Sequence, residues 1–101
     1  MNKPKIYRQG DVILIETDYY TKESIKDYAT LSDNKLVIAS ENGNRHVLNA
    51  LVYHRYEQLY VVVEKPTPMT HPQHPQLIIE PGVYEVRFVR DYALRTQRPI
   101  D

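Results

Sequence analysis

The sequence has no cysteine, no tryptophan, one phenylalanine and three glycines among its 101 residues. Without cysteine, disulfides, zinc–thiolate sites and cysteine nucleophiles are all excluded. Three glycines leave little backbone for cradling a phosphate, and the sequence contains neither a P-loop nor a G-x-G-x-x-G motif. It also lacks a nucleophile elbow. The common signatures of nucleotide-binding proteins and hydrolases are therefore missing.

The chain also lacks an excess of charge and a long hydrophobic run. Its 13 Lys and Arg residues balance 13 Asp and Glu residues, so binding to nucleic acid mainly through phosphate neutralisation is not favoured. The longest apolar stretches, 12–15 and 59–63, are too short to span a bilayer. No apolar run of signal-peptide length follows the charged N-terminus. We expect a soluble, cytoplasmic protein with no membrane partner, folded as one domain over residues 1–101.

Tyrosine is the unusually frequent residue, with nine copies. A tyrosine suits a half-buried sheet position, where its ring packs and its hydroxyl stays in water. Tyrosine is also enriched in binding surfaces. In a small β domain the first interpretation is favoured over the second.

Short apolar runs separated by turn residues predict the fold. Runs that indicate buried strands lie at 12–15, 36–39 and 59–63. Residues 83–90 alternate like a strand with one buried face, and Asn-Gly at 42–43 fits a hairpin turn. We therefore predict an all-β, mainly antiparallel fold, a small barrel or sandwich of about six or seven short strands. The pattern also allows one short helix near residues 21–29.

Four prolines fall between residues 65 and 75. Proline fixes φ and has no N–H to donate, so neither a helix nor a central strand is expected here. We predict an extended, polyproline-like connection. The proline spacing loosely matches ligands of Pro-recognising domains, but inside a folded domain such a segment more often bridges strands.

Three of the four histidines are candidate functional residues. His71 and His74 lie in the Pro-rich segment, and His46 lies at the head of an apolar face. In a straight polyproline helix His71 and His74 would be about 9 Å apart along the axis, so they meet only if the chain turns at Gln73. Neutral imidazole binds zinc, nickel or iron, which makes His46, His71 and His74 candidate metal ligands. The same spacing also fits surface-loop histidines or a general acid–base role without metal, and the sequence identifies no cofactor.

Arg90 closes the last predicted strand and, by the two-residue period, joins the face of Tyr84, Val86 and Phe88. An arginine that continues an apolar face needs a partner, either a carboxylate such as Asp11 or a bound anion. A structural ion pair is the favoured interpretation, because unpaired buried charge is rare.

Several short motifs occur in a suggestive order. They are Gln9-Gly10-Asp11-Val12, the hairpin ending in His46, Thr70-His71-Pro72-Gln73-His74-Pro75, Pro81-Gly82-Val83-Tyr84-Glu85-Val86 and Arg90-Asp91-Tyr92. In this the chain resembles a family of small bacterial and phage-associated proteins of no established function, with the pattern Q-G-D-V, G-H-x-H, T-H-x-x-H, P-G-x-Y-x-V and R-E-Y. Asn44 stands where that family has the first hairpin histidine, which removes one potential metal ligand, and Asp91 stands where it has glutamate.

The resemblance implies a shared fold and a shared site, but it supplies no activity. The ligand-binding candidates are His46, His71, His74, Arg90 and Tyr92. Three hypotheses follow. The first is a binding or accessory module, associated with a phage or mobile element, that recognises a small ligand or a protein near the histidines. The second is a small histidine- or metal-dependent hydrolase or nucleotide-processing enzyme. The third is a structural subunit that pairs with its own copies through edge strands. The missing catalytic signatures favour the first.

Overall fold

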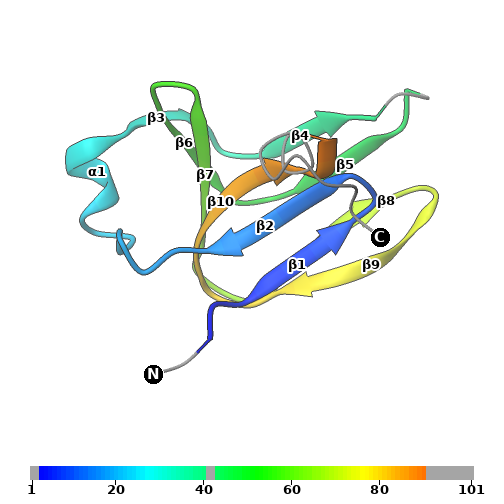
Figure 1. Cartoon of the computed structure of the whole chain (residues 1–101), viewed down its shortest axis with the longest axis horizontal. Helices are drawn as coiled ribbons and strands as arrows, with labels where there is room; N and C mark the ends of the chain where they lie inside the picture. The colour runs from blue at the N-terminus through cyan, green and yellow to red at the C-terminus, as the bar shows by residue number, and fades with distance from the viewer. Residues whose placement is uncertain (1–2, 41–42, 91–101) are drawn as a thin grey trace.

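The computed structural model describes residues 3–40 and 43–90, more than half of which lie in antiparallel strands (Figure 1). The strands are β1 (Ile6–Gln9), β2 (Val12–Glu16), β3 (Thr30–Asp33), β4 (Leu36–Ala39), β5 (Arg45–Leu48), β6 (Leu51–Arg55), β7 (Gln58–Val63), β8 (Thr67–His71), β9 (His74–Ile79) and β10 (Gly82–Phe88). One short helix, α1 (Ile25–Tyr28), lies between β2 and β3, inside the predicted range. Within these ranges no helix is long and apolar enough to cross a membrane.

The strands form two sheets. One has six strands in the order β1-β2-β10-β7-β6-β3, and the other has four in the order β4-β5-β8-β9. All of their pairings are antiparallel. The predicted all-β, mainly antiparallel fold is confirmed, and of the two forms considered it is the sandwich, because the described strands do not close into one barrel.

The main hydrophobic core fills the space between the two sheets. Its buried residues are Val12, Leu14, Leu36, Leu48, Ala50, Val52, Val61, Val63, Met69, Ile79, Tyr84 and Val86. A second, smaller core of Tyr20, Ile25, Tyr53, Val62 and Val83 lies on the other face of β6, β7 and β10. β7 therefore contributes alternate residues to both cores, which explains why its sequence is apolar on both faces.

The Pro-rich segment departs from the prediction. It forms β8 and the start of β9, and β8 is a central strand of the four-stranded sheet. The expectation of an extended connection without a central strand is wrong for a local reason. β5 pairs with β8 only at Met69 and Thr70, so Pro68 lies beyond that ladder and its missing N–H removes no bond to β5. Pro75 lies on β9, at the edge of the sheet, where proline is tolerated.

The number of strands also exceeds the prediction, with ten rather than about six or seven. One reason is the segment from Arg45 to Tyr53, in which His46, Leu48, Ala50 and Val52 follow the two-residue period that is typical of one strand. It divides at Asn49 into β5 and β6, which belong to different sheets. This break takes His46 into the four-stranded sheet, opposite the turn that joins β1 and β2.

Candidate functional site

The structure brings the three candidate histidines together. His46 lies on β5, His71 ends β8 and His74 begins β9. The ring centroids are 4.3 Å apart for His46 and His71, 4.7 Å for His71 and His74, and 6.2 Å for His46 and His74. His71 and His74 are paired across the β8–β9 hairpin, whose turn at residues 72–73 brings their rings to the same side.

Gln9, the last residue of β1, fixes the protonation of the His46 ring. Its Nε2 donates to the carbonyl oxygens of Met69 at 2.9 Å and Pro75 at 3.0 Å, so its Oε1 faces the other way as an acceptor. That oxygen lies 2.9 Å from Nδ1 of His46. Nδ1 must therefore carry the proton and donate it, and in the neutral ring Nε2 is left with its lone pair.

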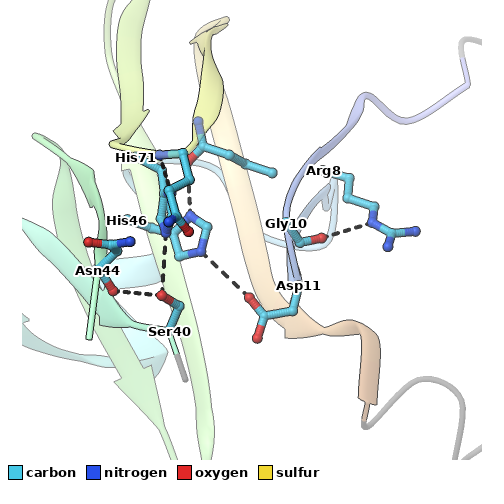
Figure 2. A network of polar contacts seen from close by, with 9 residues as sticks. Arg8, Gly10, Asp11, Ser40, Asn44, His46 and His71 are labelled. Carbon is cyan, nitrogen blue, oxygen red and sulfur yellow. Dashed lines mark hydrogen bonds and ion pairs between the residues drawn. The ribbon is translucent and has the colours of Figure 1, made fainter. Parts of the chain in front are cut away.

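The hydrogen-bonding capacity of Nε2, the other nitrogen of the His46 ring, is not satisfied by the described residues. Only 1% of the His46 side chain is exposed, and among the described residues Nε2 has no hydrogen-bond partner. Its polar neighbour is Asp11 Oδ1, 3.5 Å away on a side chain that is 54% exposed (Figure 2). A neutral imidazole and a carboxylate both present lone pairs here, so the two atoms attract each other only when a proton or another donor lies between them.

Burial sets the charge of His46. Its pKa lies below the ordinary value of 6.5, first because removal from water disfavours the imidazolium form, and next because of His71. The Asp11 carboxylate acts in the opposite direction, but it does not prevail. His46 is therefore neutral at pH 7, and Nε2 is an acceptor without a donor.

His71 has the opposite tautomer to His46. Its Nδ1 accepts the backbone N–H of Gln73 at 3.0 Å, so the proton of the neutral ring is on Nε2. Nε2 lies 3.4 Å from Ser40 Oγ, and that hydroxyl donates to the backbone carbonyl of Asn44 at 2.8 Å (Figure 2). Hydrogen-bond contacts thus link His71 through Ser40 to the backbone of the β4–β5 hairpin.

Gly10 in the β1–β2 turn allows the rings to approach the chain. It has a φ of +59°, and a Cβ there would lie 2.8 Å from His74 Nε2 and 3.3 Å from His46 Cε1. Residues with a Cβ rarely adopt this φ, and a Cβ here would force the His74 ring to shift. Arg8 Nε donates to the Gly10 carbonyl at 2.9 Å, which holds the turn in place. Glycine is thus required both by backbone conformation and by the packing of two imidazoles.

An open hollow borders the rings on the His71 side. Its volume is about 570 Å³, and it is lined by Gly43, Asn44, Arg45, Val47, Thr70, His71 and Pro72. Arg45 is exposed on its wall, while His71 is 7% exposed at its inner end. Of the three histidines, only His71 lines this hollow.

A family model described as "Domain of unknown function (DUF8820)" matches residues 8–88. The chain belongs to this family. No curated protein and no solved structure matches the chain. The matched segment includes Gln9, Gly10, Asp11 and all three histidines, so the whole arrangement described above lies inside the family domain. The resemblance to an uncharacterised family is confirmed to that extent.

The geometry of the family domain bears on the metal hypothesis. Among residues 3–40 and 43–90, no group of three or more His, Asp or Glu side chains could hold a metal ion. The tautomers give a physical reason: Nε2 of His71 carries a proton because Nδ1 is an acceptor, so His71 cannot ligate through Nε2 without losing the Gln73 bond. Among the described residues, Nε2 of His46 is a buried ring nitrogen that presents its lone pair without a hydrogen-bond partner.

The two remaining candidates do not join the rings. Arg90 lies just after β10, and its side chain is exposed, so it needs no buried partner. Asp11, which was named as one possible carboxylate partner of Arg90, lies beside His46. Tyr92 lies outside the described residues.

Sequence reasoning named the histidines but missed the residues that orient them. Gln9 and Gly10 appeared only as part of a motif, and Ser40 was not among the candidate residues. Gln9 is 2% exposed, which is unusual for glutamine, and its three hydrogen bonds all cross to the other sheet. The sequence signal that could have identified Gln9 is its place as a polar residue directly before the tight turn at Gly10 and Asp11.

Proposed function

We propose that this chain is a small binding module that recognises a small polar ligand at the imidazole site, which we define as His46, His71, His74 and Asp11. One observation carries the proposal. Nε2 of His46 is buried, unprotonated and without a hydrogen-bond partner among the described residues, and it faces a carboxylate 3.5 Å away. A buried acceptor left in this way destabilises the fold by about 1–3 kcal/mol unless something donates to it.

The chemistry of the two atoms defines the ligand. A lone pair and a carboxylate oxygen 3.5 Å apart are both satisfied by one donor atom about 2.8 Å from each. A protonated amine suits this place best, because it has several N–H donors and its charge offsets that of Asp11. The exposed Asp11 side chain is the side from which such a ligand would enter. A lysine side chain of a protein partner would offer the same group.

The other hypotheses receive less support. A metal-dependent hydrolase needs ligands whose lone pairs converge, and the protonated Nε2 of His71 does not supply one. We place the module in the cytoplasm, in keeping with the lack of cysteine. Its association with a phage or mobile element rests on the motif resemblance and stays part of the proposal.

Thermal unfolding with a panel of small ligands tests the proposal. The full chain is titrated with methylamine, ethanolamine, putrescine and Nα-acetyl-lysinamide as chloride salts, with sodium chloride at equal ionic strength as reference and zinc chloride as a separate arm. We expect a saturable rise in Tm with at least one amine, because a ligand that binds only the folded state stabilises it. In Asp11→Asn the apparent affinity should fall at least about tenfold.

His54→Ala is the matched control, since His54 is an exposed histidine on β6, in the other sheet. It should respond to the amine as the parent does. The proposal fails if no amine gives a saturable rise, or if Asp11→Asn responds as strongly as the parent. A rise with zinc alone that needs His71 and His74 would replace it with the metal hypothesis.

A further inference from the structure

A second feature lies far along the chain from the histidines, around Arg55 at the end of β6. Tyrosine rings gather there: Tyr20 lies 5.7 Å from Tyr28 and 5.4 Å from Tyr60, centroid to centroid. Two rings of this region are exposed, Tyr56 at 88% and Tyr28 at 58%. Large exposed aromatic side chains gathered in one place are typical of a binding surface.

Arg55 is held at the centre of these rings. One guanidinium nitrogen, Nη1, donates to the hydroxyl of Tyr20 at 2.5 Å. The guanidinium carbon lies 5.9 Å from the ring centroid of Tyr28 and 5.5 Å from that of Tyr56, within the range of cation–π contacts. The rings thus fix the orientation of a planar cation without neutralising it.

Among the described residues Arg55 takes part in no ion pair, whereas Arg87 nearby in the sheet is bound by Glu85. Glu57 follows two residues later, but it is exposed and makes no ion pair with Arg55. A guanidinium has five N–H donors in a fork that matches carboxylate and phosphate oxygens. The hydrogen bond to the Tyr20 hydroxyl uses Nη1 of Arg55, so further N–H donors of that fork remain for an anion.

The guanidinium opens onto a hollow of about 410 Å³, which is lined by Tyr20, Arg55, Tyr56, Glu57, Gln58 and Tyr60. Gln58 does not compete for an anion, because its Nε2 already donates to the backbone carbonyls of Leu59 and Val86. Tyr20, Tyr56 and Tyr60 contribute aromatic rings to the lining, and Arg55 contributes a cation beside the carboxylate of Glu57. This combination suits a flat ligand that carries an oxyanion.

The backbone at Tyr56 supports the same interpretation. Tyr56 and Glu57 form the two-residue loop between β6 and β7, and Tyr56 has a φ of +55°. Glycine or asparagine ordinarily occupies such a position, because a Cβ is strained there. A tyrosine kept in this conformation and almost fully exposed contributes nothing to the core. Its ring serves instead to cover the guanidinium.

We propose that Arg55 and the rings of Tyr20, Tyr28, Tyr56 and Tyr60 form a binding site for a carboxylate or phosphate group attached to an aromatic ring. The oxyanion binds the free edge of the Arg55 guanidinium, and the attached ring stacks against the exposed tyrosines. This site is separate from the imidazole site and does not depend on it.

NMR titration of the full chain tests the site with four probes: benzoate, phenyl phosphate, acetate and inorganic phosphate. We expect benzoate or phenyl phosphate to shift the ring signals of Tyr28 and Tyr56 saturably, and the probe without a ring to bind at least about tenfold more weakly. The stronger of the two aromatic probes identifies the oxyanion as carboxylate or phosphate. The proposal is overturned if no probe moves these signals, or if acetate and inorganic phosphate bind as well as the aromatic probes.

Variants separate recognition from general charge. Arg55→Gln should weaken binding at least about tenfold, and Arg55→Lys should also weaken it, because an ammonium lacks the planar fork. Arg87→Gln removes the same charge from an arginine already held by Glu85 and should bind like the parent. Equal affinity in Arg55→Gln and Arg87→Gln would overturn the proposal. If Arg55→Gln unfolds, Tyr28→Leu removes one exposed ring outside the strands, and unchanged affinity in that variant would be equally contrary.

Discussion

His46 shows how burial and hydrogen bonding act on one side chain. Gln9 fixes the Nδ1 proton, and burial keeps the ring neutral, so Nε2 remains an open acceptor beside Asp11. The neutral state is a property of the folded protein, since in the unfolded chain the ring returns to water and to its ordinary pKa of 6.5. A difference in pKa between the two states makes stability depend on pH.

The sign of this dependence is definite. The folded pKa of His46 lies below 6.5, so the unfolded chain binds the extra proton first as the pH falls. The contribution of His46 to stability is complete above pH 6.5 and is lost progressively below it. We expect the free energy of unfolding in urea to be lower at pH 5 than at pH 7.5.

Two variants assign the pH effect to this residue. His46→Gln should flatten the dependence between pH 7.5 and 5, whereas His54→Ala, at an exposed position, should keep it. A parent protein that is as stable at pH 5 as at pH 7.5 would contradict the prediction, as would an unchanged slope in His46→Gln.

At the scale of elements, the β6–β7 hairpin contains a conformation that its residue does not favour. Tyr56 has a φ of +55°, which costs a residue with a Cβ about 1–2 kcal/mol relative to glycine. Tyr56→Gly relieves this strain but adds freedom to the unfolded chain. We expect a net gain of about 0.5–1 kcal/mol in the free energy of unfolding, measured in urea, together with weaker binding of the aromatic oxyanion.

Glu57→Gly is the control for the hairpin, because Glu57 lies at the next position of the loop and does not have a positive φ. Glycine there relieves no strain and should leave stability equal to the parent or lower. If Tyr56→Gly is less stable than Glu57→Gly, the tyrosine stabilises the fold through contacts, and strain is not the reason for its effect.

The elements also show where sequence rules apply and where they fail. The run at 59–63 was apolar on both faces and indeed forms β7, between β6 and β10. The four prolines were expected to prevent a central strand, but Pro68 lies beyond the short ladder that joins β5 and β8. Proline removes one donor at one position. Whether that donor was needed depends on strand register, which a single sequence does not specify.

At the scale of the whole molecule, Gln9 connects the two sheets. It belongs to β1 of the six-stranded sheet, and its side chain contacts β5, β8 and β9 of the other sheet. Gln9→Leu would leave two carbonyls and the Nδ1–H of His46 without partners. Each buried group left in this way costs about 1–3 kcal/mol, so for three groups we expect a loss of at least about 3 kcal/mol in the free energy of unfolding in urea.

The same substitution at Gln76 provides the reference. Gln76 lies exposed on the edge strand β9, so Gln76→Leu should change stability by no more than about 0.5 kcal/mol. A Gln9→Leu protein as stable as Gln76→Leu would show that the contacts between the sheets at Gln9 do not contribute to folding.

The sequence by itself determined the class of fold and named the three histidines that the structure brings together. Apolar runs of strand length with turn residues between them predicted an all-β, mainly antiparallel fold, a small barrel or sandwich, since the period of the pattern indicates which side chains are buried. A turn at Gln73 was recognised as the condition for His71 and His74 to meet, and the chain does turn there. These features could be predicted because each depends on residues that are close together in the sequence.

Only the tertiary structure decided how those residues act. The pairing of His46 with Asp11, the position of Gln9 and the exposure of Arg90 all depend on which sheet each strand joins. Likewise, Arg55 meets Tyr20 and Tyr28 because the helical segment folds back over β6. These contacts join residues from about 25 to more than 60 positions apart. Strand order and register create them, and both are set by packing of the whole core, beyond any local pattern in the chain.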